Sequence, residues 1–271
     1  MLGQDVVAAA AAGGHELAAL AHGELDITDQ RAVADAVARA RPDVVLNCAA
    51  WTDVDGAESS PDAADAVNGT GAGVVAEAAA AGGAWTIHVS SDYVFDGEKR
   101  EPYVESDSAA PLSAYGRSKL AGEHAVAAAA PDAHTIVRSS WLFGAGGKSF
   151  PKTILKLASE RDELTVVEDQ VGCPTFTGHL AGAIVSLCER EVPGVVHVAA
   201  SGQCSWFELA AEICAQAGLR CRVTPGRTAD LGRPAPRPAY SVLRSERGEQ
   251  VPRLADWHEG LADFLQARVP S

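Results

Sequence analysis

The sequence predicts an α/β protein in which helices cover both faces of a parallel sheet. Short apolar runs typical of buried strands alternate with longer runs in which apolar residues recur at helical spacing. Hydroxyl and amide side chains follow directly after several strand runs, and ligands bind at that end of the strands in sheets of this class. With 47% hydrophobic and 21% charged residues among 271, the chain can bury a sizeable core.

The strands and helices can be placed in order along the chain. The predicted strands are residues 43–47, 86–90, 135–138, 164–167 and 195–198, and a further strand region ends at residues 21–23. The predicted helices are residues 30–41, 63–81, 113–128, 150–161, 178–190 and 205–217. The last helix begins with Ser205 as N-cap, and Glu208 completes a capping box. This alternation is typical of a Rossmann-type doubly wound parallel sheet.

The start of the chain departs from this pattern. A dinucleotide-binding sheet opens with a strand and a glycine-rich turn, whereas residues 1–7 already have the pattern of the helix after that turn. Gly3 would be the last glycine of the turn. We therefore expect the first strand and the glycine-rich turn to be missing from this chain. A shortened but functional variant is the alternative.

Charge and cysteine content exclude some classes of function. The net charge of −14, from 22 basic and 36 acidic residues, argues against nucleic acid as a partner. Six cysteines show no metal-ligand spacing with each other or with histidine, so no metal site is indicated. No signal peptide or membrane span is predicted, and the expected location is the cytoplasm.

The most informative segment is residues 113–119, in which Tyr115 and Lys119 lie four positions apart. At that spacing both side chains project from one face of a helix. A nearby ammonium would lower the pKa of the tyrosine, which makes it a proton donor or acceptor near neutral pH. Ser91, at the end of the 86–90 strand, could add a hydrogen bond to a substrate oxygen. The three residues suit proton transfer at a carbonyl or alcohol.

Further motifs narrow the assignment. The chain resembles the extended short-chain dehydrogenase/reductase superfamily in its strand-end serine and Tyr-x-x-x-Lys helix. Residues 92–97, 137–144, 167–175 and the arginine-proline segment 233–238 are similar, in this order, to motifs of the dTDP-4-dehydrorhamnose reductase family. The resemblance implies a dinucleotide-binding domain with the catalytic residues at 1–145. It also implies a smaller, mainly substrate-binding lobe at 146–271, with some segments returning to the sheet.

The resemblance also implies roles for individual residues. Ser91, Tyr115 and Lys119 would be catalytic, with Lys119 also holding the nicotinamide ribose. The expected cofactor-binding residues are Gly3, Asp26, Ile27, Ala49, Ala50, Tyr115 and Lys119. The expected substrate-binding residues are Asn68, Ser91, Asp92, Val94, Trp141, Asp169, Gln170, Pro174, Thr175 and Arg237. Arg237, or Arg233, would supply the positive charge that a diphosphate requires in an acidic protein.

The expected activity is reduction of the C4 keto group of dTDP-4-dehydro-β-L-rhamnose by NADPH or NADH. Residues 21–23 contain neither an acid for a ribose hydroxyl nor an arginine for a 2′-phosphate, so the cofactor preference stays open. The resemblance allows Mg²⁺ at a subunit contact, although no residue spacing indicates it. We expect a monomer or homodimer. The alternatives are another nucleotide-deoxysugar 4-ketoreductase and a non-catalytic regulatory subunit like the methionine adenosyltransferase β subunit.

Overall fold

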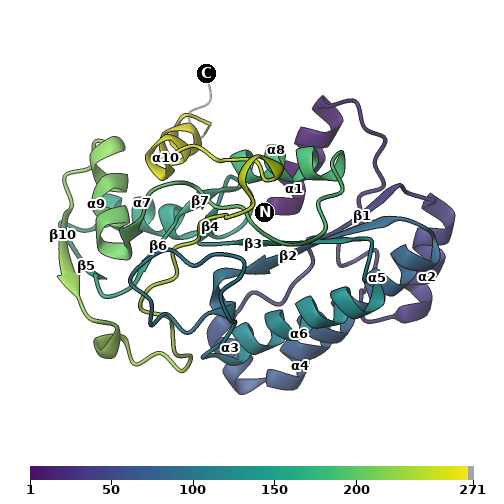
Figure 1. Cartoon of the computed structure of the whole chain (residues 1–271). Coiled ribbons are helices and arrows are strands. Elements are labelled where there is room, and N and C mark those ends of the chain that lie inside the picture. Colours follow the sequence, from purple (N-terminus) through teal and green to yellow (C-terminus); the bar gives the residue numbers. More distant parts are fainter. Residues whose placement is uncertain (268–271) are drawn as a thin grey trace.

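The computed structural model describes residues 1–267 and contains a parallel sheet with helices on both faces (Figure 1). The strands lie in the order β1 (Val44–Asn47), β2 (Trp85–Ser91), β3 (His134–Ser139) and β8 (Gly194–His197), and every pair is parallel. The predicted α/β class is confirmed. The β2–β3 ladder runs to Ser91 and Ser139, so the hydroxyls that follow the apolar runs meet at the carboxyl edge of the sheet.

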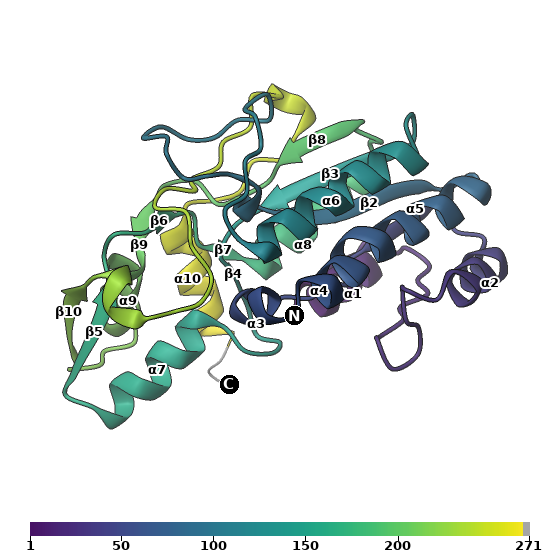
Figure 2. The same ribbon diagram turned by 90° about the horizontal axis from the view of Figure 1, so that it is seen from below.

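The two faces of the sheet are covered by helices from different parts of the chain. On one face, α1 (Leu2–Ala12) packs against α8 (Thr177–Cys188), and Ile184, Leu187 and Val196 are completely buried between this layer and the strands. The other face carries α2 (Gln30–Ala40), α5 (Gly71–Ala81) and α6 (Ala114–Ala129), as Figure 2 shows. Both α8 and β8 come from the second half of the chain.

The second half also forms a separate lobe with its own core. Its helices are α7 (Phe150–Glu160), α9 (Trp206–Gln216) and α10 (Trp257–Gln266). They pack with three two-stranded sheets: β5 (Glu163–Val167) with β10 (Arg222–Gly226), β6 (Val171–Gly172) with β9 (Cys204–Ser205), and β4 (Leu142–Phe143) with β7 (Thr175–Phe176). Leu209, Ile213 and Phe264 are buried in this second core. The predicted strand at 164–167 therefore belongs to the lobe and not to the main sheet.

The predicted helices are present with small changes. The capping box of Ser205 and Glu208 at the start of α9 is confirmed. The predicted helix 63–81 is divided into α4 (Pro61–Asp65), a π-helical turn (Ala66–Thr70) and α5. Two helices were not predicted, α10 and the short α3 (Val54–Ser59). Asp53 caps α3 by accepting a hydrogen bond from the backbone N–H of Gly56. Short 3-10 turns occur at Asp92–Val94, Thr228–Leu231 and Gly248–Gln250.

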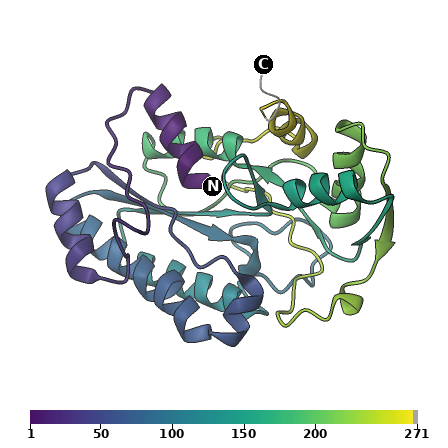
Figure 3. The same ribbon diagram turned by 180° about the vertical axis from the view of Figure 1, so that it is seen from behind.

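The strand region expected before residue 23 is not formed. Residues 14–29 cross from α1 on one face to α2 on the other as turns and irregular chain (Figure 3). Their backbone hydrogen bonds are local, such as Glu24 N–H to Ala21 O at 2.8 Å. A strand needs a neighbour to supply its ladder bonds, and within residues 1–267 β1 pairs only with β2. In the same range, no helix is both long and apolar enough to span a membrane.

Candidate active site

The expected catalytic side chains come from two adjacent elements. Ser91 ends β2, and Tyr115 and Lys119 lie on α6, whose N-cap Ser113 accepts a hydrogen bond from the backbone N–H of Gly116. The absence of a side chain at Gly116 allows close approach, since a Cβ there would stand 2.2 Å from the backbone oxygen of Tyr93. Close packing of α6 on the turn after β2 therefore brings Tyr115 to Ser91.

The surroundings of Tyr115 favour its neutral form. Burial raises the pKa of Tyr115 to about 12, a hydrogen bond with Ser91 opposes this shift, and the nearby Asp92 carboxylate adds to it. The ring of Tyr93 meets the Tyr115 ring edge-on, at a centroid distance of 5.4 Å. The expected lowering of the tyrosine pKa by Lys119 is therefore wrong for this structure, because burial outweighs any attraction from the lysine.

Lys119 is enclosed and faces the sheet. Its side chain lies among buried groups, with only 2% of the residue exposed, and its Nζ donates to the backbone oxygen of Val89 at 2.7 Å. The Nζ atom also lies 3.5 Å from Nε2 of His88. Burial lowers the pKa of Lys119 to about 8, while attraction from Glu123 opposes that shift. An amine with this pKa can gain and lose a proton near neutral pH.

A buried ion pair supports this part of the site. Glu123, one turn after Lys119, accepts bonds from Nε and Nη2 of Arg138 at 2.8 and 2.6 Å and from the Ser90 hydroxyl at 2.5 Å. Arg138 lies on β3, so the pair connects α6 to the sheet. Because both partners are almost fully buried, each compensates the charge of the other.

Asp92 is an acid inside the same cluster. Its carboxylate accepts from the hydroxyls of Ser91 at 3.0 Å and Ser241 at 2.6 Å. Burial raises the pKa of Asp92 to about 6. The side chain of Val94, two residues later, is fully buried with Phe95 and packs in the core. Of these two expected substrate residues, Asp92 is the one that contacts a member of the expected catalytic trio, Ser91.

Asn68 connects two loops to α6. Its side-chain amide accepts from the backbone N–H of Trp51 at 2.8 Å and donates to the Trp51 oxygen and to the Ser118 hydroxyl. Both the oxygen and the nitrogen of the Asn68 amide are therefore hydrogen-bonded within the protein. Asn68 therefore lies next to α6, the helix of Tyr115 and Lys119, and holds the segment after β1 against it.

The expected cofactor residues fall into two groups. Gly3, Ala49 and Ala50 gather at the carboxyl end of β1, where a Cβ on Gly3 would lie 3.7 Å from the Cys48 Cβ. All three have small side chains or none, which stays compatible with the expected close approach of a cofactor. Asp26 accepts hydrogen bonds from the Thr28 backbone and hydroxyl, which hold the pKa of its carboxyl below the usual value. Ile27 packs against the start of α5.

The expected substrate residues of the lobe form a polar and aromatic chain. Asp169 accepts from the backbone N–H and hydroxyl of Thr228, and the Gln170 amide contacts both Thr228 and the indole N–H of Trp206. The rings of Trp141 and Trp206 are stacked with centroids 3.6 Å apart. Trp141 adopts a φ of 49°, in the left-handed region that few non-glycine residues occupy.

Pro174 and Thr175 lie where this chain turns into β7. Thr175 is fully buried and accepts from the backbone N–H of Ala200 at 3.1 Å. The structure thus gives Thr175 a role in the framework of the lobe. Trp206 was missed by the sequence interpretation, although an aromatic residue directly after the Ser205 cap is a signal that could have identified it.

The arginine-proline segment is held by an acid from the other half of the chain. Asp55 on α3 accepts from Arg237 at 2.8 Å, from Arg233 at 3.3 Å and from the backbone N–H of Ala235 at 3.2 Å. Both arginines line a cavity of about 310 Å³. Glu58, on the same short helix, accepts from the backbone N–H of Ala114 at the start of α6. The sequence interpretation missed these two acids, since only the fold brings them to their partners.

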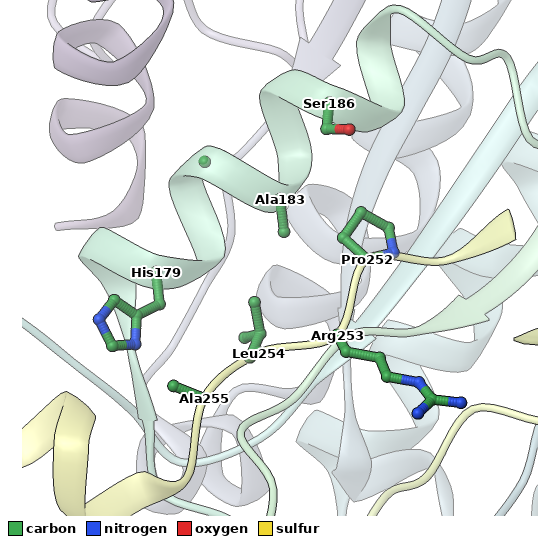
Figure 4. Close-up of a pocket in the computed structure, with 8 residues that line it drawn as sticks. His179, Ala183, Ser186, Pro252, Arg253, Leu254 and Ala255 are labelled. Carbon is green, nitrogen blue, oxygen red and sulfur yellow. The ribbon is translucent and has the colours of Figure 1, made fainter. Parts of the chain in front are cut away.

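A second cavity, of about 380 Å³, lies elsewhere. It is formed by α8 and residues 252–255, as Figure 4 shows, and its lining includes no member of the expected catalytic trio. His179 at one end pairs with Asp263 at 2.7 Å. Among residues 1–267, no three His, Cys, Asp or Glu side chains are placed to hold a metal ion.

Comparison with known proteins identifies the family. The model of the RmlD substrate binding domain matches residues 1–269. A dTDP-4-dehydrorhamnose reductase from Mycolicibacterium smegmatis is 45% identical over 99% of this chain and 83% of its own length. A probable dTDP-4,6-dihydroxy-2-methyloxan-3-one 4-ketoreductase from Streptomyces antibioticus is 41% identical, with 100% of this chain and 94% of that protein covered.

A solved structure agrees with these relatives. The dTDP-4-dehydrorhamnose reductase of Bacillus anthracis, in complex with NADP, is 37% identical and superposes with a TM-score of 0.95, covering 98% of this chain and 95% of that one. The sequence resemblance is thus confirmed over the whole chain, together with the Rossmann-type fold. The chain belongs to the dTDP-4-dehydrorhamnose reductase family of oxidoreductases.

Proposed function

We propose that this protein reduces the C4 keto group of dTDP-4-dehydro-β-L-rhamnose to the hydroxyl of dTDP-β-L-rhamnose. The observation that carries the proposal is the contact of Tyr115 with Ser91 at the carboxyl end of β2, with Lys119 one turn further along α6. A neutral phenol beside a serine hydroxyl is the arrangement that a carbonyl oxygen needs when it accepts a proton. NADPH or NADH supplies the hydride to C4 when bound.

The chain's own residues carry the proton. Tyr115 donates its phenolic proton to O4 as the carbonyl is reduced, and its raised pKa keeps that proton in place before the reaction. Ser91, the hydrogen-bond partner of Tyr115, donates to the same oxygen in this proposal and stabilises its negative charge. Lys119, with a pKa of about 8, returns a proton toward the tyrosinate. Transfer of a proton from the Lys119 ammonium restores the Tyr115 phenol, and protonation of the resulting amine from solvent restores the ammonium.

The lobe recognises the nucleotide-sugar in this proposal. Trp141 and Trp206 offer aromatic faces, and the Arg237 guanidinium supplies a cation for the diphosphate. Asp55 already compensates that cation in the structure, so the diphosphate would share or replace the contact. Reduction of a related 4-keto-deoxysugar is the second candidate, and it is favoured by the Streptomyces antibioticus relative described above.

Cofactor oxidation with identified products tests the proposal. The protein is mixed with NADPH or NADH, dTDP-4-keto-6-deoxyglucose and a 3,5-epimerase, and absorbance at the nicotinamide band is followed while the sugar product is identified by NMR. Epimerase-dependent oxidation that yields dTDP-β-L-rhamnose is expected. Oxidation without the epimerase would assign another 4-keto-sugar as the substrate, and no oxidation by folded protein would contradict the proposal.

The same assay distinguishes an enzyme from the regulatory subunit considered as an alternative. The expected trio, Ser91, Tyr115 and Lys119, is retained on two packed elements, which supports the enzyme. Sedimentation of the same sample decides between monomer and homodimer. The cofactor with the higher kcat/KM gives the preference between NADPH and NADH.

A further inference from the structure

His88 is a buried titratable residue that the proposed chemistry does not use. It lies on β2 with none of its surface exposed, between Asn47 of β1 and Lys119 of α6. Its Nδ1 is 3.3 Å from the Asn47 Nδ2, and its Nε2 is 3.5 Å from the Lys119 Nζ. The imidazole thus connects an amide that cannot change its charge to a lysine that can.

The hydrogen bonds of Asn47 decide which ring nitrogen carries the proton. The backbone N–H of Ala49 donates to one end of the Asn47 amide at 3.0 Å, and a backbone N–H can only donate. That end must therefore be the carbonyl oxygen, and the end that faces His88 must be the NH₂ group. Because the NH₂ group donates, His88 Nδ1 has to accept, and in a neutral imidazole the proton then lies on Nε2.

Burial keeps this imidazole neutral. Desolvation, with a smaller contribution from Lys119, lowers the pKa of His88 well below its ordinary value. The Nε2–H group then points toward Lys119. An ammonium has no lone pair and would oppose this N–H, whereas a neutral amine can accept it. The orientation fixed by Asn47 consequently favours the uncharged form of Lys119.

We propose that His88, held as its Nε2–H tautomer by Asn47, is a positioning residue that sets the protonation of Lys119. The catalytic consequence of this assignment rests on the proposed function, because it requires Lys119 to take part in the reaction. The tautomer of His88 does not depend on the proposed function. Since Lys119 already has a pKa near 8, the extra donor makes transfer of its proton toward Tyr115 easier. The imidazole acts through Lys119 and does not touch the reacting carbonyl.

Other charges that face Lys119 act in the opposite direction. Glu123 on α6 favours the ammonium, although Arg138 of β3 largely compensates its charge. Cys48 after β1 would favour the ammonium only as a thiolate, and burial raises the pKa of that thiol to about 11. Near neutral pH, His88 therefore offers Lys119 a donor, while the Glu123 carboxylate and the Val89 oxygen offer a negative charge and an acceptor.

Nitrogen NMR reads the tautomer without substrate or cofactor. In protein labelled with ¹⁵N-histidine, long-range proton–nitrogen spectra distinguish a protonated Nε2 from a protonated Nδ1, and the signals absent from His88→Gln assign the residue. We expect Nε2–H across neutral pH. An Nδ1–H tautomer or an imidazolium at pH 7 would overturn the proposal, whether or not the protein reduces a keto-sugar.

Removing the amide tests the effect on the lysine. Asn47→Ala removes the amide that donates to His88 Nδ1, so the imidazole can adopt the Nδ1–H tautomer and its Nε2 can accept from the Lys119 ammonium. The proton affinity of Lys119 should then rise about tenfold, which is the worth of one hydrogen bond. ¹³C-lysine NMR measures this as an upward shift of about one pH unit in the titration midpoint. The alkaline limb of the kcat profile should move with it, while KM for the sugar stays constant.

Thr86→Val is the matched control. Thr86 is buried on β2, the strand that carries His88, and its hydroxyl has no hydrogen-bond partner within the described chain. Its removal should therefore leave the titration midpoint of Lys119 unchanged. An unchanged midpoint in folded Asn47→Ala would overturn the proposal. If that variant does not fold, Asn47→Asp keeps the acceptor for Ala49 and should convert His88 to the Nδ1–H tautomer. Retention of Nε2–H there would equally overturn it.

Discussion

The catalytic cluster and the arginine-proline segment of the lobe are held in opposite ways. Around Tyr115 and Lys119 the supporting contacts are buried, including the ion pair between Glu123 and Arg138. Arg237 is tied instead to Asp55, whose side chain is 29% exposed, and the partners are far apart in sequence. Burial makes the first set expensive to break, while solvent weakens the second. The proposed reacting groups are therefore fixed, and the proposed recognition groups can exchange partners.

The largest effect is expected from the reacting hydroxyl itself. Tyr115→Phe removes the proton donor and should lower kcat by about 10²- to 10⁴-fold, because that is the usual contribution of a positioned acid. Cofactor affinity, measured by nicotinamide fluorescence, should be almost unchanged. Tyr93→Phe, which alters the ring packed edge-on against Tyr115, is the control and should retain most activity. Comparable turnover in Tyr115→Phe would remove this residue from the mechanism.

The buried ion pair should give the next largest effect. Arg138→Met leaves the Glu123 carboxylate uncompensated inside the protein, and the free energy of unfolding should fall by about 3–5 kcal/mol. Urea unfolding followed by circular dichroism measures the loss. The double variant that adds Glu123→Gln should recover part of it, since no buried charge remains unpaired. A double variant less stable than the single one would show that the pair is not what connects α6 to the sheet.

Asp92 should make the free energy of unfolding fall as the pH rises from about 4 to about 6. Its pKa is about 6 in the folded protein and 3.8 in the unfolded chain, so the folded state binds the proton more tightly between these values. The contribution of Asp92 is thus fully favourable below pH 4 and is lost by pH 6, a difference of about 3 kcal/mol. Unfolding curves of the wild type and Asp92→Asn should therefore diverge over this range. Parallel curves would contradict the raised pKa.

The smallest effect is expected at the partly exposed contact between Asp55 and Arg237. Asp55→Asn keeps an acceptor for the Ala235 backbone but loses the charge that orients Arg237, so KM for the nucleotide-sugar should rise several-fold with kcat nearly constant. Stability should change by about 1 kcal/mol or less. Arg222→Gln, which removes an exposed ion pair with Glu163 outside the proposed site, is the matched control. A change in kcat alone would mean that Asp55 acts on the catalytic cluster.

Local sequence was enough to predict most of the regular structure. The helix with Tyr115 and Lys119 at positions four apart, the capping box of Ser205 and Glu208, and the strand ending at Ser91 are all present. Each depends on contacts within a few residues or on an apolar pattern that the chain displays directly. The strand expected before residue 23 failed because a strand also needs a neighbour, and that requirement cannot be seen in the segment itself.

The family could likewise be predicted from ordered motifs. Three contacts could be seen only in the tertiary structure. Asp55 pairs with Arg237, and Trp206 stacks on Trp141. His88 lies between Asn47 and Lys119. It also reversed the expected pKa shift of Tyr115, because the extent of burial depends on packing and not on helical spacing. Spacing fixes which side chains share a face. Desolvation and long-range partners, which set their charge, arise only when distant segments pack together.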